Sequence, residues 1–319
     1  MTAVATLPGV LVAAGHWDPE PWAAPFRVDI GRPVMIWPHV TDPSAVHYVL
    51  AWAPPPEAFL GLPNLKAIFS LGAGVDHILG KAALPDVPVV RIVDPDLTMR
   101  MTEWVVLQVL LHHRRQLAYL RQQAAHRWKE IAQPVAKDVR VGLMGLGELG
   151  QASARVLVQL GFDVAGWSRK PKSVPDAVCF SGADGLDPFL ARTDILVVLL
   201  PATPETRGIL DRALFAKLPR DGALGGAVLI NAGRGALQVE ADILDALESG
   251  ALIGASLDVF EKEPLPAESP LWSRPDVVIT PHVAATSDAA VLAEGIRRAI
   301  LDFEAGKPLS NVIDPKRGY

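Results

Sequence analysis

Cysteine is nearly absent from this 319-residue chain, in which Cys179 is the only one. A single cysteine excludes an intrachain disulfide and a cysteine-based zinc site. Its neighbours, residues 177–180, are mostly apolar and include no base, so the sequence predicts a buried strand thiol rather than a nucleophile. The histidines show no metal-ligand spacing with nearby carboxylates, and no metal site is predicted.

Long apolar runs and clusters of positive charge are missing as well. The apolar run at 195–200 is far too short to span a bilayer, so we expect no membrane partner. The formal net charge is −5 and no compact run of Lys and Arg occurs, which argues against a nucleic-acid partner. No cationic segment opens the chain, and residues 10–14 resemble a first strand more than a signal-peptide core. We therefore expect a cytoplasmic location.

The residues that are present are typical of a globular protein, with 50% hydrophobic and 20% charged side chains. A chain of this length suits two domains. Its first hundred residues alternate short apolar runs with links rich in proline and glycine, a pattern typical of an α/β domain. These runs lie at 10–14, 34–37, 48–52, 67–71 and 89–93.

After Pro95 a proline-free stretch with apolar residues at helical spacing predicts one long helix over about 98–128. Apolar strands then alternate with helical segments, which indicates a parallel sheet covered on both faces. These strands are expected at 139–144, 162–167, 195–200, 227–231, 252–258 and 277–280.

The predicted fold class is α/β, with two Rossmann-like domains that have parallel sheets and are joined by long helices. We expect a flavodoxin-like substrate domain from residues 1–100 and 286–319, with the last helix, about 287–305, returning to it. Residues 101–285 are expected to form the dinucleotide-binding domain.

A glycine-rich turn follows the strand predicted at 139–144 and precedes a helical pattern. In this setting Gly145 can make a tight turn, Gly147 lets backbone N–H groups reach phosphate oxygens, and Gly150 allows close helix packing. The helix N-terminus adds unpaired donors and partial positive charge. The predicted pyrophosphate site consists of Gly145, Leu146, Gly147, Glu148, Leu149 and Gly150.

The end of the next strand bears on which nicotinamide cofactor is used. NAD-preferring folds place an acidic residue there to bind the ribose hydroxyls. This chain has Ser168, Arg169 and Lys170 instead, a hydroxyl and two cations suited to a 2′-phosphate. Asp163 lies too early, at the start of the strand. We therefore predict a preference for NADPH, with NADH possible; a solvated basic turn is the alternative.

Three charged or titratable residues follow successive predicted strands: Arg234, Glu263 and His282. Because ligands bind outside the carboxyl ends of strands in open α/β sheets, we expect the three to converge beside the nicotinamide. A histidine can deliver a proton to a carbonyl oxygen, and a carboxylate on its other ring nitrogen would orient it. An arginine can hold the oxygens of a 2-oxo acid. Singly, each residue is more often a surface or packing residue; together they indicate catalysis.

Four motifs in this order resemble the D-isomer-specific 2-hydroxyacid dehydrogenase family, over essentially the whole chain. They are the glycine turn, Asn-Ala-Gly-Arg-Gly at 231–235, Asp-Val-Phe-x-x-Glu-Pro at 258–264 and Thr-Pro-His at 280–282. Within the family the chain is most similar to the glyoxylate/hydroxypyruvate reductase A group. The segments that carry this likeness lie at 70–76, 200–206, 264–272 and 317–319.

The resemblance implies NADPH-dependent reduction of small 2-oxo acids, glyoxylate to glycolate and hydroxypyruvate to D-glycerate. Arg234 would clamp the substrate, Glu263 would partner the histidine, and His282 would be the general acid. It implies a substrate carboxylate held by the backbone N–H groups of Ala73, Gly74 and Val75, where tightly turned glycines can aim amides at an anion; an ordinary turn is the alternative.

Further cofactor contacts are implied for the adenosine side and the nicotinamide side of the cleft. The adenosine side would be lined by Leu200, Pro201 and Thr206, and the nicotinamide flanked by Ala232, Gly233, Arg234, Asp258 and His282. Met101 would touch the nicotinamide, or fill the core instead. Trp52 would cap the substrate pocket, or serve in the core or an interface.

The family resemblance also implies a homodimer that uses the helix near 98–128, on which Trp104 and Tyr119 look exposed. Two other functions stay open. One is a dehydrogenase for a bulkier or phosphorylated substrate, although no regulatory domain is expected after the final helix. The other is a non-catalytic, nucleotide-gated dimer or corepressor, which would not need a general acid.

Overall fold

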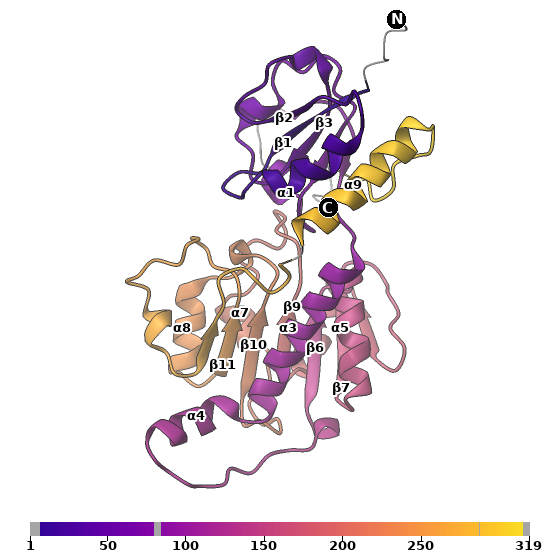
Figure 1. The fold of residues 1–319 in the computed structure, drawn as a ribbon. Helices are drawn as coiled ribbons and strands as arrows, with labels where there is room; N and C mark the ends of the chain where they lie inside the picture. The colour runs from indigo at the N-terminus through magenta and orange to yellow at the C-terminus, as the bar shows by residue number, and fades with distance from the viewer. Residues whose placement is uncertain (1–6, 80–83, 287, 315–319) are drawn as a thin grey trace, which may run out of the picture. The chain divides into compact units, whose positions relative to one another are not determined.

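The computed structural model describes residues 7–79, 84–286 and 288–314. The 317–319 motif lies outside these residues. The chain forms two compact units, one made of the chain up to Asp94 and from the last helix onward, the other of Pro95–Thr286. The α/β fold with two parallel sheets is confirmed, and each unit has its own sheet (Figure 1).

The described part of the first unit contains a five-stranded parallel sheet in the order β2-β1-β3-β4-β5, which is the flavodoxin-like order. Its strands are β1 (Gly9–Ala13), β2 (Val34–Ile36), β3 (Val46–Ala51), β4 (Ala67–Ser70) and β5 (Val89–Val90). Its helices are α1 (Glu20–Ala23), α2 (Asp76–Leu79) and α9 (Ala289–Glu304), with 3₁₀ turns η1 (Ala24–Val28), η2 (Pro43–Ala45) and η3 (Pro56–Phe59).

Ion pairs hold α9 against the N-terminal part of this unit. The Arg32 guanidinium, whose side chain is fully buried, binds Asp29 at 2.9 Å and Glu304 of α9 at 2.8 Å. Arg297 of α9 also binds Asp29. A buried arginine is tolerated only with such partners, so the pairing fixes α9 beside α1 and η1.

The second unit contains a seven-stranded parallel sheet in the order β12-β11-β10-β9-β6-β7-β8, as the described residues define it. Read from β6 outward in both directions, this is the Rossmann order. Its strands are β6 (Arg140–Met144), β7 (Asp163–Ser168), β8 (Val178–Ser181), β9 (Ile195–Val198), β10 (Ala227–Asn231), β11 (Leu252–Leu257) and β12 (Val277–Ile279). Its helices are α3 (Pro95–His113), α4 (Gln116–Ala124), α5 (Glu148–Gln159), α6 (Leu186–Ala191), α7 (Arg212–Phe215) and α8 (Glu240–Glu248), with 3₁₀ turns η4 (Ala136–Asp138), η5 (Gly235–Leu237) and η6 (Pro270–Ser273).

Alternate residues of each central strand enter opposite cores, as the twofold period of a strand requires. On β9, Leu196 and Val198 join the core under α6, α7 and α8, whereas Ile195 and Val197 join the core under α3 and α5. Figure 1 shows α3 and α5 side by side on one face of the sheet. The continuous apolar character of the strands follows from burial on both faces.

Two sequence expectations were wrong in this unit. The helix expected over 98–128 is interrupted after His113, where Arg115 adopts φ +56° and its guanidinium donates to the Leu224 carbonyl oxygen at 3.0 Å. α4, which lies within the described range 84–286, has no buried residue. Cys179 does lie on a strand, but β8 is an edge strand and the thiol is only half-buried.

Candidate active site

The glycine turn joins β6 to α5, and each glycine has a different steric reason. Gly145 has φ +114°, and a Cβ there would lie 2.9 Å from the Leu199 carbonyl oxygen. A Cβ at Gly150 would lie 1.9 Å from the Gly145 carbonyl oxygen, so α5 packs directly on the turn. At Gly147, by contrast, no described atom lies within 4 Å of an added Cβ. The turn thus offers open space in front of the α5 N-terminus, where a phosphate group fits.

The residues between these glycines differ in their burial. Leu146 is buried, and its side chain occupies the space that a Cβ at Gly166 would need. Leu149 packs against the core under α3 and α5. Glu148 is the exposed first residue of α5. The conformation of the turn is therefore determined by its glycines and by the packing of Leu146 and Leu149.

The residues at the end of β7, 168–170, include two cations and no carboxylate. Arg169 and Lys170 are exposed, whereas Ser168 is 9% exposed and its hydroxyl donates to the Lys170 carbonyl oxygen at 2.7 Å. The Ser168 hydroxyl thus folds the turn that presents the two cations. Asp163, at the start of the strand, binds Arg192 at 2.6 Å.

The loop after β9 is compact because Thr206 closes it. The Thr206 hydroxyl donates to the Pro201 carbonyl oxygen at 2.7 Å and accepts the Thr203 N–H at 2.8 Å. Leu200 at the base of this loop is buried. A Cβ at Gly233 would lie 2.7 Å from the Leu200 carbonyl oxygen, so this loop touches the turn after β10.

The turn after β10 presents Arg234. The Gly233 N–H donates to Asn231 Oδ1 at 3.0 Å, and Arg234 Nη1 donates to the Gly233 carbonyl oxygen at 2.7 Å. Ala232 is buried, and Arg234 is half-buried. A guanidinium at a strand end is the type of group that binds carboxylate and carbonyl oxygens of a ligand.

His282 and Glu263 form a hydrogen-bonded pair. His282 Nδ1 lies 2.7 Å from Glu263 Oε2, and the two side chains are 38% and 37% exposed. The other carboxylate oxygen, Oε1, accepts the Phe260 N–H at 3.0 Å. An ionised carboxylate only accepts hydrogen bonds, so Nδ1 carries a proton and Nε2 is the ring nitrogen left to meet a ligand.

The Glu263 carboxylate stays ionised although it is partly buried. Burial would raise its pKa, but the hydrogen bonds from His282 and the Phe260 N–H and the charges of His282 and Arg234 together hold the pKa below its ordinary value. The charge of Arg234 is therefore felt at Glu263. Glu263 is thus hydrogen-bonded to His282 and lowered in pKa by the charges of both His282 and Arg234.

Asp258 shapes the turn that carries His282. The His282 N–H donates to the Asp258 carbonyl oxygen at 2.8 Å, and His282 has φ +55°. The buried Asp258 carboxylate accepts the Thr280 hydroxyl at 2.6 Å, the Val283 N–H at 2.9 Å and the Ala284 N–H at 3.0 Å. Sequence reasoning placed Asp258 beside the nicotinamide and missed these bonds, because they join residues more than twenty positions apart.

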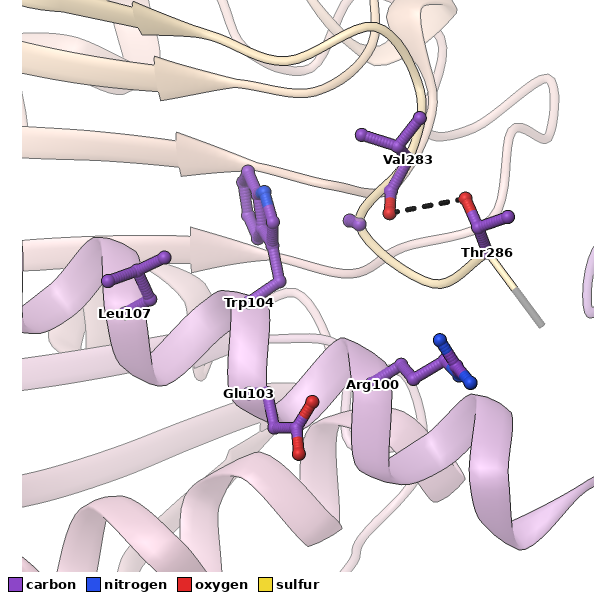
Figure 2. A pocket seen from close by; sticks show the side chains of 7 residues that line it. Arg100, Glu103, Trp104, Leu107, Val283 and Thr286 are labelled. Carbon is purple, nitrogen blue, oxygen red and sulfur yellow. Dashed lines mark hydrogen bonds between the residues drawn. The ribbon is translucent and has the colours of Figure 1, made fainter.

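A cavity of about 270 Å³ lies between α3 and the residues that follow His282 (Figure 2). Figure 2 shows the Trp104 ring reaching from α3 towards this turn, where Trp104, Met101 and Ala284 share one core. Trp104 is only 9% exposed, and its Nε1 has no partner among the described residues. The prediction from the sequence that Trp104 is exposed was therefore wrong. Met101 is 6% exposed, so α3 supports the His282 turn with apolar side chains.

The predicted substrate-binding residues of the first unit gather around the loop after β4. The Ser70 hydroxyl lies within 2.9 Å of the Gly72 and Gly74 carbonyl oxygens and tightens this loop. Trp52 stacks on Trp17 with ring centroids 4.3 Å apart and planes at 10°. A Cβ at Gly72 would lie 2.3 Å from the Trp52 ring.

The same loop carries the three residues whose backbone N–H groups were predicted to bind an anion. Val75 is buried, whereas Ala73 and Gly74 are half-buried. The Trp52 ring also lies near the His77 ring, with ring centroids 4.3 Å apart. Trp17, on which Trp52 stacks, was not predicted, since nothing in the spacing links it to Trp52.

The described residues offer neither a metal-binding cluster nor a membrane-spanning helix. No cluster of three or more His, Cys, Asp or Glu side chains there could hold a metal ion. None of the described helices is both long and apolar enough to cross a bilayer.

The chain is similar to known proteins in sequence and in fold. A family model described as "D-isomer specific 2-hydroxyacid dehydrogenase, NAD binding domain" matches residues 106–284. Glyoxylate/hydroxypyruvate reductase A of Photorhabdus laumondii is 42% identical over 284 residues, which are 87% of this chain and 89% of that protein.

Solved structures cover nearly the whole chain. The NADPH-dependent glyoxylate/hydroxypyruvate reductase of Sinorhizobium meliloti, in complex with NADP and sulfate, has a TM-score of 0.93 and 49% identity over 98% of this chain and 100% of that one. A probable 2-hydroxyacid dehydrogenase of Rhizobium etli, in complex with NADP, HEPES and L(+)-tartaric acid, has a TM-score of 0.92 and 48% identity with the same coverage. The chain therefore belongs to the D-isomer specific 2-hydroxyacid dehydrogenase family of NAD(P)-dependent oxidoreductases.

Proposed function

We propose that this protein reduces small 2-oxo acids with NADPH, glyoxylate to glycolate and hydroxypyruvate to D-glycerate. The observation that carries the proposal is the 2.7 Å hydrogen bond between Glu263 and His282, next to the charge of Arg234. The relatives from Photorhabdus laumondii and Sinorhizobium meliloti, whose names give these two substrates, support it.

His282 is the proposed general acid. With Nδ1 bonded to Glu263, its Nε2 can donate a proton to the substrate carbonyl oxygen as negative charge develops there. The neighbouring carboxylate stabilises the charged imidazolium that this donation requires. Arg234 would hold the carboxylate and carbonyl oxygens of the substrate and stabilise the developing charge.

The residues of the glycine turn fit a dinucleotide, because the open space over Gly147 faces the α5 N-terminus. When bound, NADPH supplies the hydride for the reduction. Arg169 and Lys170 would bind its 2′-phosphate, presented by the turn that Ser168 closes. The NADP complexes of the relatives from Sinorhizobium meliloti and Rhizobium etli support this preference.

The remaining predicted contacts keep their roles as part of the proposal. Leu200, Pro201 and Thr206 would line the adenosine side, where Thr206 holds the loop closed. The nicotinamide would lie near the residues predicted for it: Met101, Ala232, Gly233, Asp258 and His282. Because the Asp258 carboxylate is bonded to the His282 turn, its main contribution would be to place His282.

The first unit would bind the substrate carboxylate. The backbone N–H groups of Ala73, Gly74 and Val75 are the proposed donors, on a loop that Ser70 tightens. Trp52 would form an apolar wall whose orientation is set by its stack on Trp17. A rigid indole there favours a small substrate.

A substrate panel tests the proposal. NADPH oxidation is followed with glyoxylate, hydroxypyruvate, pyruvate and a phosphorylated 2-oxo acid, with NADH in parallel. We expect the highest kcat/KM for glyoxylate or hydroxypyruvate with NADPH. A higher kcat/KM for the bulkier, phosphorylated acid would identify that acid as the substrate instead. An equal or higher kcat/KM with NADH would overturn the cofactor preference. No turnover with any acid would favour a nucleotide-gated dimer or corepressor.

We also keep the prediction of a cytoplasmic homodimer. The segment from α3 to η4 exposes Leu107, Leu120, Trp128 and Val135, apolar side chains that contact with a second copy could bury. Trp128 is fully exposed, so Trp128→Ser should weaken association without unfolding the chain. Sedimentation of the wild type as a monomer at micromolar concentration would contradict the dimer.

A further inference from the structure

Two buried amide side chains join the Arg234 turn to the segment that carries Glu263. Asn231 ends β10 and is fully buried, and Gln238 follows η5 and is 3% exposed. Asn231 Nδ2 donates to Gln238 Oε1 at 2.9 Å, and Gln238 Nε2 donates to the Val259 carbonyl oxygen at 2.9 Å. The pair therefore connects the loop after β10 with the loop after β11.

Each end of this bridge continues to a residue of the proposed active site. At one end, Asn231 accepts the Gly233 N–H at 3.0 Å, and its Nδ2 also donates to the Arg234 carbonyl oxygen at 3.3 Å. At the other end, Val259 precedes Phe260, whose N–H donates to Glu263 Oε1 at 3.0 Å. Glu263 Oε2 then accepts from His282.

The two loops also touch directly. A Cβ at Gly235 would lie 1.8 Å from the Phe260 carbonyl oxygen, so the backbones are in contact there. At the surface, the Glu240 N–H donates to Glu261 Oε1 at 2.7 Å and the Glu261 N–H donates to Glu240 Oε1 at 2.8 Å. Water can replace these surface bonds, but it cannot reach the buried bonds of Gln238.

We propose that Gln238 is a positioning residue, which sets the placement of Arg234 relative to Glu263 and His282. This inference rests on the proposed function. Without the Gln238 amide, the Asn231 Nδ2 and the Val259 carbonyl oxygen lose buried partners, and the loops relax to satisfy them. A misplacement of about 1 Å at reacting groups can cost about 100-fold in rate. The glycine turn and the Arg169 and Lys170 pair, which would bind the phosphates of NADPH, lie outside the bridge, so the effect on kcat should exceed the effect on NADPH affinity.

The first test compares one substitution at two buried glutamines. In Gln238→Met, which keeps the length of the side chain but removes the amide, we expect kcat for glyoxylate to fall at least about 10-fold. The dissociation constant for NADPH should stay within about twofold, and kcat is counted per NADPH-binding site. Gln108→Met is the control for the same change at a buried site: Gln108 is 2% exposed on α3, its Oε1 has no partner among the described residues, and kcat should stay within about twofold.

The outcomes separate this inference from the proposed function. A wild type that reduces none of the 2-oxo acids overturns the proposed function and the inference together. An active wild type with an equally active Gln238→Met overturns the inference alone. Equal losses in Gln238→Met and Gln108→Met also overturn it, because the loss would then come from general core damage.

A double-mutant cycle tests whether Gln238 acts through the pair that it positions. The fold-loss in kcat caused by Gln238→Met is measured in the wild type and in a Glu263→Ala background. In the second background the fold-loss should be at least about threefold smaller, since the positioned carboxylate is gone. The same factor in both backgrounds would overturn the inference. Should Gln238→Met fail to fold, Gln238→Asn takes its place in both tests. It keeps the amide but is one methylene too short to span Asn231 and Val259.

Discussion

Glu263→Gln removes one charge at nearly constant shape, and the structure indicates what the change costs. The carboxylate now accepts from two donors, the Phe260 N–H at 3.0 Å and His282 Nδ1 at 2.7 Å. A glutamine has one carbonyl oxygen for these two donors, and its NH₂ group must face the other. Either His282 loses its acceptor or the Phe260 N–H does.

The expected loss follows from the exposure of the pair. A hydrogen bond between charged groups contributes about 1.5–3 kcal/mol. Since the His282 and Glu263 side chains are 38% and 37% exposed, solvent screening favours the lower part, about 1.5–2 kcal/mol. That corresponds to a kcat about 10- to 30-fold lower. The assay is glyoxylate reduction at saturating NADPH, with the dissociation constant for NADPH measured separately by fluorescence.

A kcat within twofold of the wild type would refute this reasoning, because the carboxylate would then contribute nothing at His282. The pH dependence gives a second check. Since the pKa of Glu263 lies below its ordinary value, its contribution to stability is complete above the ordinary pKa. That contribution should disappear as the pH falls through the lowered pKa. The free energy of unfolding of Glu263→Gln should therefore be below that of the wild type at neutral pH, and the two values should converge in acid.

Three further predictions concern the second unit. Gly150→Ala should destabilise the fold by about 1–3 kcal/mol, because its Cβ would overlap the Gly145 carbonyl oxygen. Gly147→Ala should fold normally and bind NADPH more weakly. Equal melting temperatures of the two variants would contradict the different steric roles of these glycines. Changing both Arg169 and Lys170 to Ala should lower kcat/KM with NADPH at least about 10-fold while leaving NADH nearly unchanged, and a parallel loss with both cofactors would count against 2′-phosphate binding. Burial lowers the pKa of His112 to about 4, so the unfolded state binds more protons below pH 6.5. Urea unfolding should show the wild type losing about 2 kcal/mol more than His112→Gln between pH 7 and pH 5, and equal losses would contradict the buried neutral imidazole.

Much of the fold is predictable from the sequence because it depends on local patterns. Apolar runs such as 195–198 mark strands buried on both faces, and the glycines at 145, 147 and 150 mark the first turn of a Rossmann sheet. Parallel strands end on one edge, so residues that follow successive strands meet there. The hydrogen bond between Glu263 and His282 is a consequence of that rule.

Features that depend on tertiary packing were not predictable. The break after α3 follows from a left-handed residue, Arg115, whose side chain reaches a carbonyl oxygen 109 positions away. Trp104 looks exposed in the helical pattern, but it packs against the turn after β12. The bridge through Gln238 joins residues 7 and 21 positions away, and no local periodicity connects them.

The central claim is that His282 gives a proton to the substrate, while the groups proposed to bind the phosphates of the cofactor lie on other turns. The most direct test is single-turnover reduction of glyoxylate by His282→Ala at saturating NADPH. General acid catalysis contributes about 10²–10⁴-fold, so the rate should fall by that factor with an unchanged dissociation constant for NADPH. A rate close to that of the wild type, or a loss of NADPH binding in place of a loss of rate, would contradict the account.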